Sequence, residues 1–372
     1  MIHRLVELEG HTVTVTDPDR RLYGDAGPTK TELMAYYARV APRLVPFLRG
    51  RAVSTVFGPN ASTQDLRFAR TAPPGCPGRF PTYRLPSFGR PELERYFTVP
   101  DGGALEALVD YGCVGFHPWS SPALAALQPT QMVFNLDPEA LAFREVRNAA
   151  LLLRELLGIC GLTAWVKTSG RQGLHVLVPL TGPVSFGDTR LVADTIATRA
   201  IRREPGLFSR DPRRGKRRGR ILIDTSRNAA GATLIAPYAI ATSGLVSALL
   251  EWDELPRPLY PDEFDLARVV AREDTDLRNQ AAFFAAEQTL EPVERYVRRS
   301  RARGTGSLHP QPDGQPLRAD TSAALIDEAL RLRAKSRRLR DDAEVTRIDS
   351  RDLLERAHKA RDDRWRLESG QG

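Results

Sequence analysis

The sequence predicts a mixture of β-strands and α-helices over residues 1–297, followed by a helical extension at the C-terminus. Short apolar segments alternate with amphipathic helical patterns from the first residues to about residue 271. A composition of 41% hydrophobic and 27% charged residues over a length of 372 is typical of a globular protein with a sizeable core. Residues 298–319 have the Arg-, Gly- and Pro-rich composition of a linker, and residues 320–372 are helical in pattern but mostly charged.

Composition also bears on the compartment. No apolar run reaches the length of a membrane span, and the first ten residues lack the apolar core of a signal peptide. The three cysteines, Cys76, Cys113 and Cys160, have neither a metal-binding nor a disulfide spacing. We therefore expect a cytoplasmic protein without a membrane partner.

The net charge of +8 favours a polyanionic partner, because Lys and Arg side chains bind phosphates and release counterions. A GC-rich genome, which favours Arg over Lys, is the alternative explanation, and the total charge does not decide between them. The position of the charge is more informative, since basic residues cluster at 213–220 and again at 298–303.

The first predicted elements are two short strands, at residues 3–10 and 11–17, and a long helix. Thr29 is the predicted N-cap of this helix, and Glu32 stands three residues later, as in a capping box. Apolar residues then recur at helical spacing, at Leu33, Tyr36, Tyr37 and Val40.

Later elements are predicted from the same two periodicities. Residues 51–100 are rich in Pro, Gly and Arg and allow few assignments. Helices are predicted at residues 103–112, 139–158 and 187–203. Strands are predicted at residues 113–120, 131–136, 163–169, 174–180, 221–226 and 233–241, with a tight turn between the third and fourth of these strands at residues 170–173.

Polar side chains stand where three of these strands end. Asn135 and Asp137 share one strand face, about 7 Å apart, and Asp224 ends another strand. Clustered oxygen ligands suit Mg²⁺ or Mn²⁺, which in turn bind a triphosphate. The turn that begins at Ser169 offers a hydroxyl and backbone N–H groups to phosphate, and His175 can donate to the same phosphates. Each feature alone is also what an ordinary turn or hairpin shows.

The order of these features resembles the three motifs of the archaeo-eukaryotic primase superfamily. The motifs are VFNLDP at 133–138, VKTSGRQGLHVLVPL at 166–180 and KRRGRILIDTSRNAAGATLIAPY at 216–238. They are most similar to the polymerase domain of bacterial DNA ligase D, which reads F-D-L-D-P, then K-T-S-G-x-K-G-L-H, then a K/R-G-R stretch before an Asp-bearing strand. The flanking segments VGFHPWSS and LLEWDELP match as well. The resemblance runs from about residue 5 to 297.

This resemblance implies an α/β (α+β) archaeo-eukaryotic primase fold with an RRM-like palm in residues 1–297, here in a stand-alone form. It also implies a DNA-directed nucleotidyltransferase (a polymerase or primase) that uses Mn²⁺ or Mg²⁺. The implied partners are nucleoside triphosphates and DNA ends, gaps or primer-templates, with Ku and a separate ATP-dependent DNA ligase. The implied setting is bacterial DNA end joining or repair in the cytoplasm, in association with the nucleoid.

Carried over by position, the resemblance makes Asp137 and Asp224 metal ligands, with Asn135 as the third member of the catalytic group. It implies that Ser169, His175 and His117 contact the incoming nucleotide.

The resemblance and the charge pattern also imply DNA contacts. Lys30 matches a lysine that, in the family, helps to bind the 5′-phosphate of a DNA end. Lys216, Arg217 and Arg218 belong to the basic run before the third motif, and we expect them to contact the DNA backbone. A solvated surface loop is the alternative for such a run.

Three positions depart from the family pattern. Asn135 replaces an aspartate, Gln172 replaces a lysine, and Ala241 replaces an arginine. Arg171, beside Gln172, is the candidate to reach the same phosphates. Each loss weakens metal or triphosphate binding, by about 10- to 1000-fold if it acts alone.

Two main interpretations follow from these departures. The protein is a working nucleotidyltransferase with reduced activity and an unusual metal demand, or a catalytically inactive pseudo-polymerase that retains DNA-end or partner binding. A degenerate duplicate without activity is the third alternative.

Overall fold

The computed structural model describes residues 2–24, 27–58, 66–71, 80–86, 93–139, 141–290 and 293. The chain divides into a unit Met1–Arg299 and a unit Ser300–Gly372. The linker and the helical tail predicted for residues 298–372 lie outside the described residues and stay predictions. Within the described ranges, no helix has the length and apolar character needed to cross a membrane.

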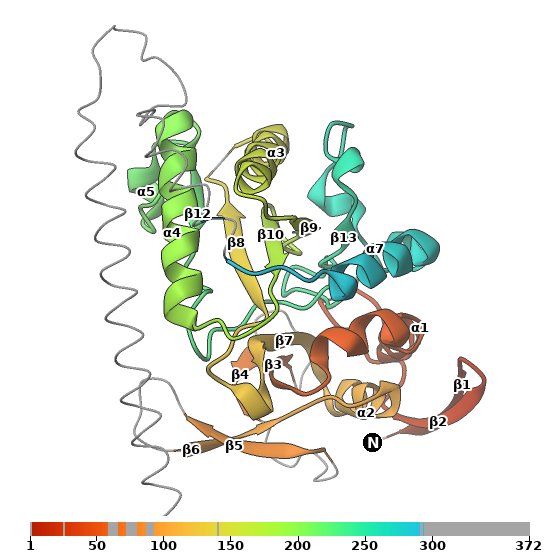
Figure 1. Ribbon diagram of the computed structural model, residues 1–372. Helices are drawn as coiled ribbons and strands as arrows, with labels where there is room; N and C mark the ends of the chain where they lie inside the picture. The colour runs from red at the N-terminus through yellow and green to blue at the C-terminus, as the bar shows by residue number, and fades with distance from the viewer. Residues whose placement is uncertain are drawn as a thin grey trace, which may run out of the picture. The chain divides into compact units, whose positions relative to one another are not determined.

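The N-terminal part of the first unit combines a hairpin, two helices and a sheet (Figure 1). The helix α1, Lys30–Leu48, begins at the predicted capping box of Thr29 and Glu32. The other helix is α2, Gly102–Tyr111, and α1 packs against it. The hairpin pairs β1, His3–Leu8, with β2, His11–Thr16. The sheet is formed by β3 (Arg51–Phe57), β4 (Arg67–Ala69), β5 (Thr82–Pro86), β6 (Leu93–Phe97) and β7 (Cys113–Pro122).

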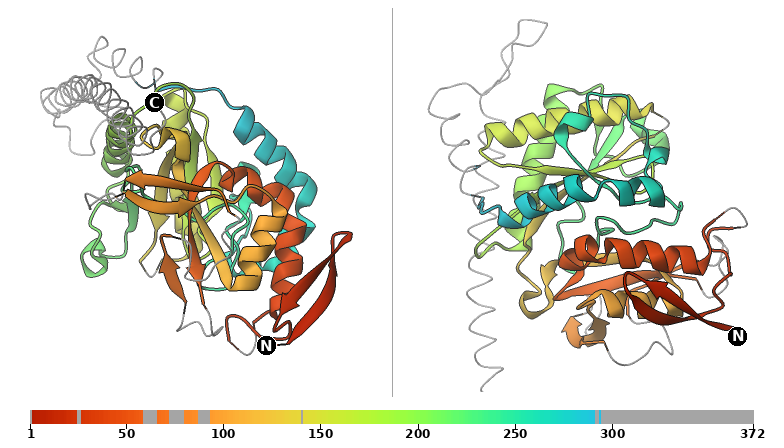
Figure 2. Two further views of the ribbon diagram at one scale, coloured as in Figure 1. Left: turned by 90° about the horizontal axis from the view of Figure 1, so that it is seen from below. Right: turned by 90° about the vertical axis from the view of Figure 1, so that its right-hand side faces the viewer.

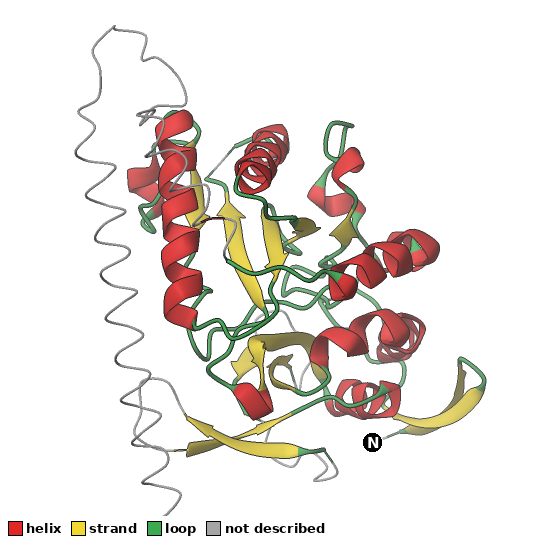
Figure 3. Ribbon diagram, viewed as in Figure 1, coloured by secondary structure: helices red, strands yellow, loops and turns green. Residues whose placement is uncertain are grey.

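The second part is a six-stranded sheet with the strand order β11-β12-β8-β10-β9-β13, which we call the palm sheet. Its strands are β8 (Gln131–Asp137), β9 (Trp165–Thr168), β10 (Leu174–Pro179), β11 (Phe208–Ser209), β12 (Ile221–Asp224) and β13 (Leu249–Leu250). All neighbouring pairs are antiparallel except β11 and β12. The helices α3, Phe143–Ile159, and α4, Phe186–Arg203, pack on β8 and β10 (Figure 3).

The two sheets occupy separate halves of this unit (Figure 2). Helix α1 connects them: Tyr36 Oη donates to the Tyr238 carbonyl at 2.7 Å, and Arg43 forms a buried ion pair of 3.0 Å with Asp276. Asp276 lies on α7, Glu273–Ala285, which the sequence did not predict. The remaining short helices are η1 (Ala123–Ala125), α5 (Arg214–Arg217), η2 (Trp252–Glu254), η3 (Pro261–Glu263) and α6 (Leu266–Ala271).

Most predicted elements are confirmed, but one strand is wrong. The helix predicted at 139–158 is α3, which begins four residues later. The predicted strand 233–241 has only isolated bridges, Trp119–Thr233 and Ile240–Val246. Its backbone groups bond instead to β7 and to residues 245–247, so the segment crosses between the two sheets without joining a ladder. Its apolar residues are buried by this crossing, which explains why their pattern resembles a buried strand.

Candidate active site

Four side chains form a line across one face of the palm sheet. Asp224 on β12 pairs with Asn135 on β8, and Asn135 pairs with His175 on β10. His175 in turn pairs with Lys167 on β9. Directly opposite residues of paired strands point to the same side of a sheet, so Asp224, Asn135, His175 and Lys167 make a polar row. Asp137, two residues beyond Asn135, shares this face.

The polar row is kept in place by the apolar residues that alternate with it. On β8 these are Phe134 and Leu136, and on β10 they are Leu174 and Val176, all of which are fully buried in the core. A slip of one residue would exchange the two faces and expose this apolar set. The structure therefore brings together the strand ends that the sequence predicted to meet, while their chemical roles stay predictions.

The metal end of the row consists of Asn135, Asp137 and Asp224, all half-buried. Asp224 Oδ1 accepts the N–H of Ser226 at 2.7 Å. No group of three or more His, Cys, Asp or Glu residues that could hold a metal is found among the described residues. Two carboxylates and one amide fit the oxygen preference of Mg²⁺ and Mn²⁺, but they bring one negative charge fewer than three carboxylates.

Arg217, predicted to contact the DNA backbone, belongs to this metal end and is not on the exposed surface. Its side chain is buried, and Nη1 donates to Asp137 Oδ2 at 2.8 Å. The other guanidinium nitrogens donate to the carbonyls of Asp211 and Pro212. Arg217 ends the short helix α5 and precedes Arg218, whose φ of 54° turns the chain, so Arg217 points inward. Lys216 and Arg218 remain exposed.

The basic end of the row is fully buried. Lys167 Nζ lies 2.9 Å from His175 Nδ1 and 2.6 Å from Ser247 Oγ. Burial lowers the pKa of Lys167 well below its usual value. Burial, followed by the charges of Lys167, Arg227 and His117, does the same to the pKa of His175. His175 is therefore a neutral imidazole at physiological pH.

His117 on β7 faces this basic end. Burial lowers its pKa to about 3, and the charges of Lys167 and Arg227 add to the effect. Its ring also packs edge-on against Phe68, with 5.4 Å between the ring centroids. The N-terminal sheet thus contributes a second neutral imidazole to the site predicted to hold the nucleotide.

The turn between β9 and β10 folds around the Ser169 hydroxyl. Ser169 Oγ accepts the N–H groups of Arg171 at 3.2 Å and Gly173 at 3.1 Å. A Cβ atom on Gly173 would lie 2.4 Å from the Leu136 carbonyl oxygen, so only glycine allows the turn to approach β8 this closely. The turn therefore sits directly beside Asn135 and Asp137 on β8.

The departures at 172 and 241 lie on the rim of this turn. Gln172 is exposed, whereas Ala241 is buried against Gly170, where an added Cβ would come within 2.5 Å of the Ala241 Cβ. Arg171 Nη2 donates to Thr242 Oγ1 at 2.7 Å. A guanidinium from the turn therefore stands next to the position where the family pattern has its arginine.

Lys30 is placed differently from its prediction as a phosphate contact. Its side chain is buried, with Nζ 2.9 Å from Asp110 Oδ1 and 2.6 Å from the Thr16 carbonyl oxygen. The ammonium group is thus neutralised by α2 and held by β2. A DNA phosphate would have to compete with Asp110 for the Lys30 ammonium group.

Comparison with known proteins identifies the family of the chain. The family model of the LigD primase-polymerase domain matches residues 29–279. The chain belongs to this family. Its fold matches the solved polymerase domain from Mycobacterium tuberculosis Ligase D in complex with DNA, with a TM-score of 0.64 and 27% identity. That match covers 72% of this chain and 98% of the solved domain, and it confirms the predicted fold class.

Curated relatives are longer. The multifunctional non-homologous end joining DNA repair protein LigD of Mycobacterium tuberculosis (strain H37Rv) is 29% identical over 332 residues, which cover 85% of this chain and 42% of the relative. The multifunctional non-homologous end joining protein LigD of Pseudomonas aeruginosa is 30% identical over 299 residues, with coverages of 78% and 35%. The chain therefore spans less than half the length of these LigD proteins.

Sequence reasoning missed two residues that shape the LigD-type site. Lys167 lies in the second motif, and a lysine inside an apolar strand is itself a signal of an unusual environment. Asn228 was not singled out. Its side chain donates to the Val133 carbonyl and accepts the Val133 N–H, at 2.7 and 2.8 Å, which ties the turn after Asp224 to β8.

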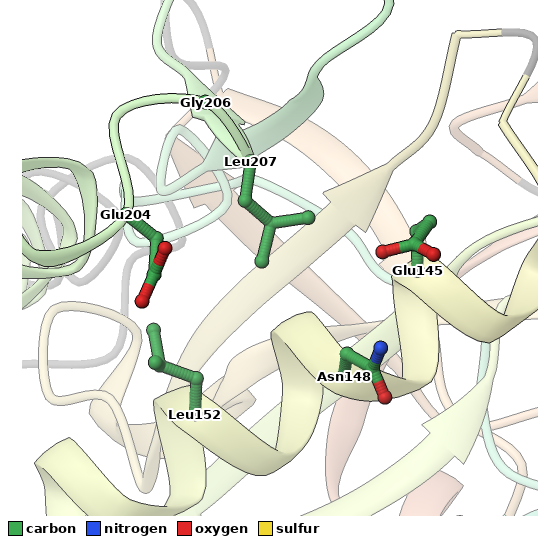
Figure 4. A pocket seen from close by; sticks show the side chains of 6 residues that line it. All are labelled: Glu145, Asn148, Leu152, Glu204, Gly206 and Leu207. Carbon is green, nitrogen blue, oxygen red and sulfur yellow. The ribbon is translucent and has the colours of Figure 1, made fainter.

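A surface pocket elsewhere has no part in this site. It lies at α3 and the connection from α4 to β11 and is lined by Glu145, Asn148, Leu152, Glu204, Gly206 and Leu207 (Figure 4). None of these residues belongs to the polar row. Two glutamates also make the lining unsuitable for a triphosphate, because like charges repel.

Proposed function

We propose that the protein is a DNA-directed nucleotidyltransferase that acts in DNA end joining or repair with reduced activity. The observation that carries this proposal is the polar row, in which Asp224, Asn135 and a neutral histidine line up, with Asp137 on the same face, beside the Ser169 turn that we propose to bind phosphate. Such a row is suited to hold a metal-bound triphosphate at one end of a sheet.

In this proposal Asp137, Asp224 and the amide oxygen of Asn135 would hold Mn²⁺ or Mg²⁺. A bound metal of this kind neutralises the triphosphate and activates an attacking hydroxyl. His175 donates to a phosphate oxygen, and Ser169 offers its hydroxyl proton, since its oxygen already accepts the N–H groups of Arg171 and Gly173. Arg171 supplies positive charge from beside Thr242, which partly replaces the charges absent at Gln172 and Ala241.

The reduced activity has two physical causes in this proposal. Asn135 removes one negative charge from the metal end. Arg217 already neutralises Asp137 through a contact of 2.8 Å, so a metal ion must compete with a buried guanidinium for that carboxylate. Both effects raise the metal concentration that the reaction needs.

DNA is the proposed macromolecular substrate. The solved polymerase domain from Mycobacterium tuberculosis Ligase D is in complex with DNA, and this chain carries a net charge of +8. Lys216 and Arg218 are exposed beside the metal end and are the proposed DNA-backbone contacts. Ku and a separate ATP-dependent DNA ligase are the proposed protein partners, in the cytoplasm and in association with the nucleoid.

The alternative function is a pseudo-polymerase that binds DNA ends or partners without catalysis. The ion pair between Arg217 and Asp137 is the observation that favours it, because the chain itself satisfies one predicted metal ligand.

The two functions are separated by nucleotide addition to a primed, gapped DNA in the presence of Mn²⁺. We expect weak extension by the unmodified protein and none by Asp224→Ala. Extension that is equal in the two proteins would indicate a contaminating polymerase, and its complete absence at every Mn²⁺ concentration would favour the pseudo-polymerase.

A further inference from the structure

Lys167 is a buried lysine without a carboxylate partner among the described residues. Its side chain is inaccessible to solvent, and no carboxylate pairs with it among the residues that the structure describes. Lysines are almost never fully buried unless they are paired. The ion pair of Arg43 and Asp276 shows the usual arrangement in this same protein. The burial of Lys167 therefore calls for an explanation other than an ion pair.

The neighbours of Lys167 Nζ determine its hydrogen bonds. Ser247 Oγ donates its own proton to the Thr168 carbonyl oxygen at 2.8 Å, so it accepts from Lys167 Nζ at 2.6 Å. Ser247 is held in turn by backbone bonds to Tyr238 and Ala239. The remaining close neighbour of Nζ is His175 Nδ1 at 2.9 Å, whereas the Thr168 carbonyl oxygen is at 3.5 Å.

This arrangement sets the tautomer of His175. When Nζ is protonated it has donors only, so beside its bond to Ser247 it can approach His175 Nδ1 at 2.9 Å only as a donor. A neutral imidazole that accepts at Nδ1 carries its single proton on Nε2. Nε2 makes no hydrogen bond within the part of the chain that the structure describes, so this N–H is free for a ligand.

We propose that Lys167 is a positioning residue that holds His175 in the Nε2–H tautomer, so that the imidazole donates to a phosphate oxygen of the bound triphosphate. This inference rests on the proposed function for its ligand. The opposite tautomer would turn a lone pair toward the phosphate and repel it. Asn135, the register partner of His175 on β8, places the metal end directly beside this donor.

The tautomer of His175 can be measured without an assay of enzymatic activity. In ¹⁵N-histidine-labelled protein, NMR correlations distinguish a protonated Nε2 from a protonated Nδ1, and His175→Gln identifies the signal among the six histidines. We expect Nε2 protonated and Nδ1 bare from pH 6 to pH 8. A proton on Nδ1 in the unmodified protein would overturn the proposal, whether or not the protein proves to be an enzyme.

The variant that removes the donor is Lys167→Met, which keeps the length and the apolar stem. We expect this variant to contain both tautomers of His175. We also expect its affinity for a nucleoside triphosphate, measured with Mn²⁺, to fall roughly 10- to 100-fold, as for a lost hydrogen bond to a charged group. DNA affinity should not change. Unaltered tautomer and unaltered triphosphate affinity in Lys167→Met would contradict the proposal.

Two further variants keep the test decisive. Lys167→Gln retains an N–H donor and should recover part of the triphosphate affinity that Lys167→Met loses. Ser247→Ala leaves Lys167 and His175 in place but removes the acceptor that holds Nζ. It should produce the same mixture of His175 tautomers to a smaller extent, and it serves as the test if Lys167→Met fails to fold. An Nε2–H tautomer in a protein that binds no triphosphate would uphold the positioning role and contradict the proposed function instead.

Discussion

The two ends of the polar row differ in burial and in how far they follow the LigD pattern. The basic end, Lys167 and His175, keeps the residues of the family motif and is sealed in the core. The metal end has lost a carboxylate at Asn135, and its side chains are half-buried. The other two departures, Gln172 and Ala241, also lie outside the buried network, on the rim of the turn.

Physical constraints explain this difference. Replacing one member of a buried hydrogen-bond network leaves its partners unsatisfied, which costs about 1–3 kcal/mol for each group. The basic end is therefore maintained by folding stability whether or not the protein is catalytic. At the metal end Asp137 is constrained in the same way by the buried Arg217, so Asn135 and Asp224 are the residues that report most directly on function.

The largest expected effect follows from removing Asp224. The change Asp224→Asn keeps the shape of the side chain but removes a second negative charge from the metal end. We expect nucleotide addition to fall about 100- to 1000-fold, the scale of losing one preorganised electrostatic group. Extension of primed, gapped DNA measures it, with melting of the variant as the control for folding. Full activity in Asp224→Asn would exclude this carboxylate as a ligand.

A second prediction contrasts two buried basic residues. Asp276→Ala leaves Arg43 buried without an anionic partner and should lower the free energy of unfolding by about 3–5 kcal/mol. Lys167→Met takes a hydrogen-bond partner from the buried Ser247 and His175 but leaves no charge unpaired, so we expect a smaller loss of about 1–3 kcal/mol. Chemical denaturation of both variants makes the comparison. Equal destabilisation would mean that Lys167 is primarily a structural residue.

DNA binding should respond to the exposed basic residues beside the metal end. The double charge reversal Lys216→Glu and Arg218→Glu should weaken binding to all sequences about equally, roughly 10-fold at physiological salt, and reduce the salt slope by about 2. The matched control is the double reversal Arg4→Glu and Arg39→Glu, two exposed arginines on β1 and α1 whose ion-pair partners are Asp19, Glu9 and Glu273. Salt dependence that is unchanged in the double variant would place the DNA elsewhere.

Acid should destabilise the basic end. The pKa of His117 is lowered to about 3 in the folded protein, below its usual value of about 6.5. Between these two values the unfolded chain binds more protons, so the free energy of unfolding falls as the pH drops from about 6.5 toward 3. In His117→Gln this part of the pH dependence should be missing. An identical pH profile in both proteins would mean that His117 is readily protonated in the fold.

The sequence predicted local features well and the burial of long basic side chains poorly. The capping box at Thr29 and the strands that carry Asn135, Asp137 and Asp224 depend on residues close in the chain, and they are confirmed. Lys30 and Arg217 were expected to face DNA.

The positions of these two basic residues depend on distant partners. Asp110 of α2 draws Lys30 inward, and Asp137 of β8 does the same for Arg217. Neither pairing leaves a trace in the local pattern, because the partners are separated by 80 residues in the chain in each case. The strand predicted at 233–241 is wrong for a related reason, since its backbone partners are divided between β7 and residues 245–247.

The metal end is tested most directly by the Mn²⁺ dependence of nucleotide addition in the unmodified protein and in Asn135→Asp, measured side by side. The substitution restores a third carboxylate next to His175 without disturbing the buried basic end. We expect extension to rise about 10- to 100-fold and to reach half of its maximum at a lower Mn²⁺ concentration. No gain in activity and no tighter Mn²⁺ binding in Asn135→Asp would contradict a site that is limited by its metal end.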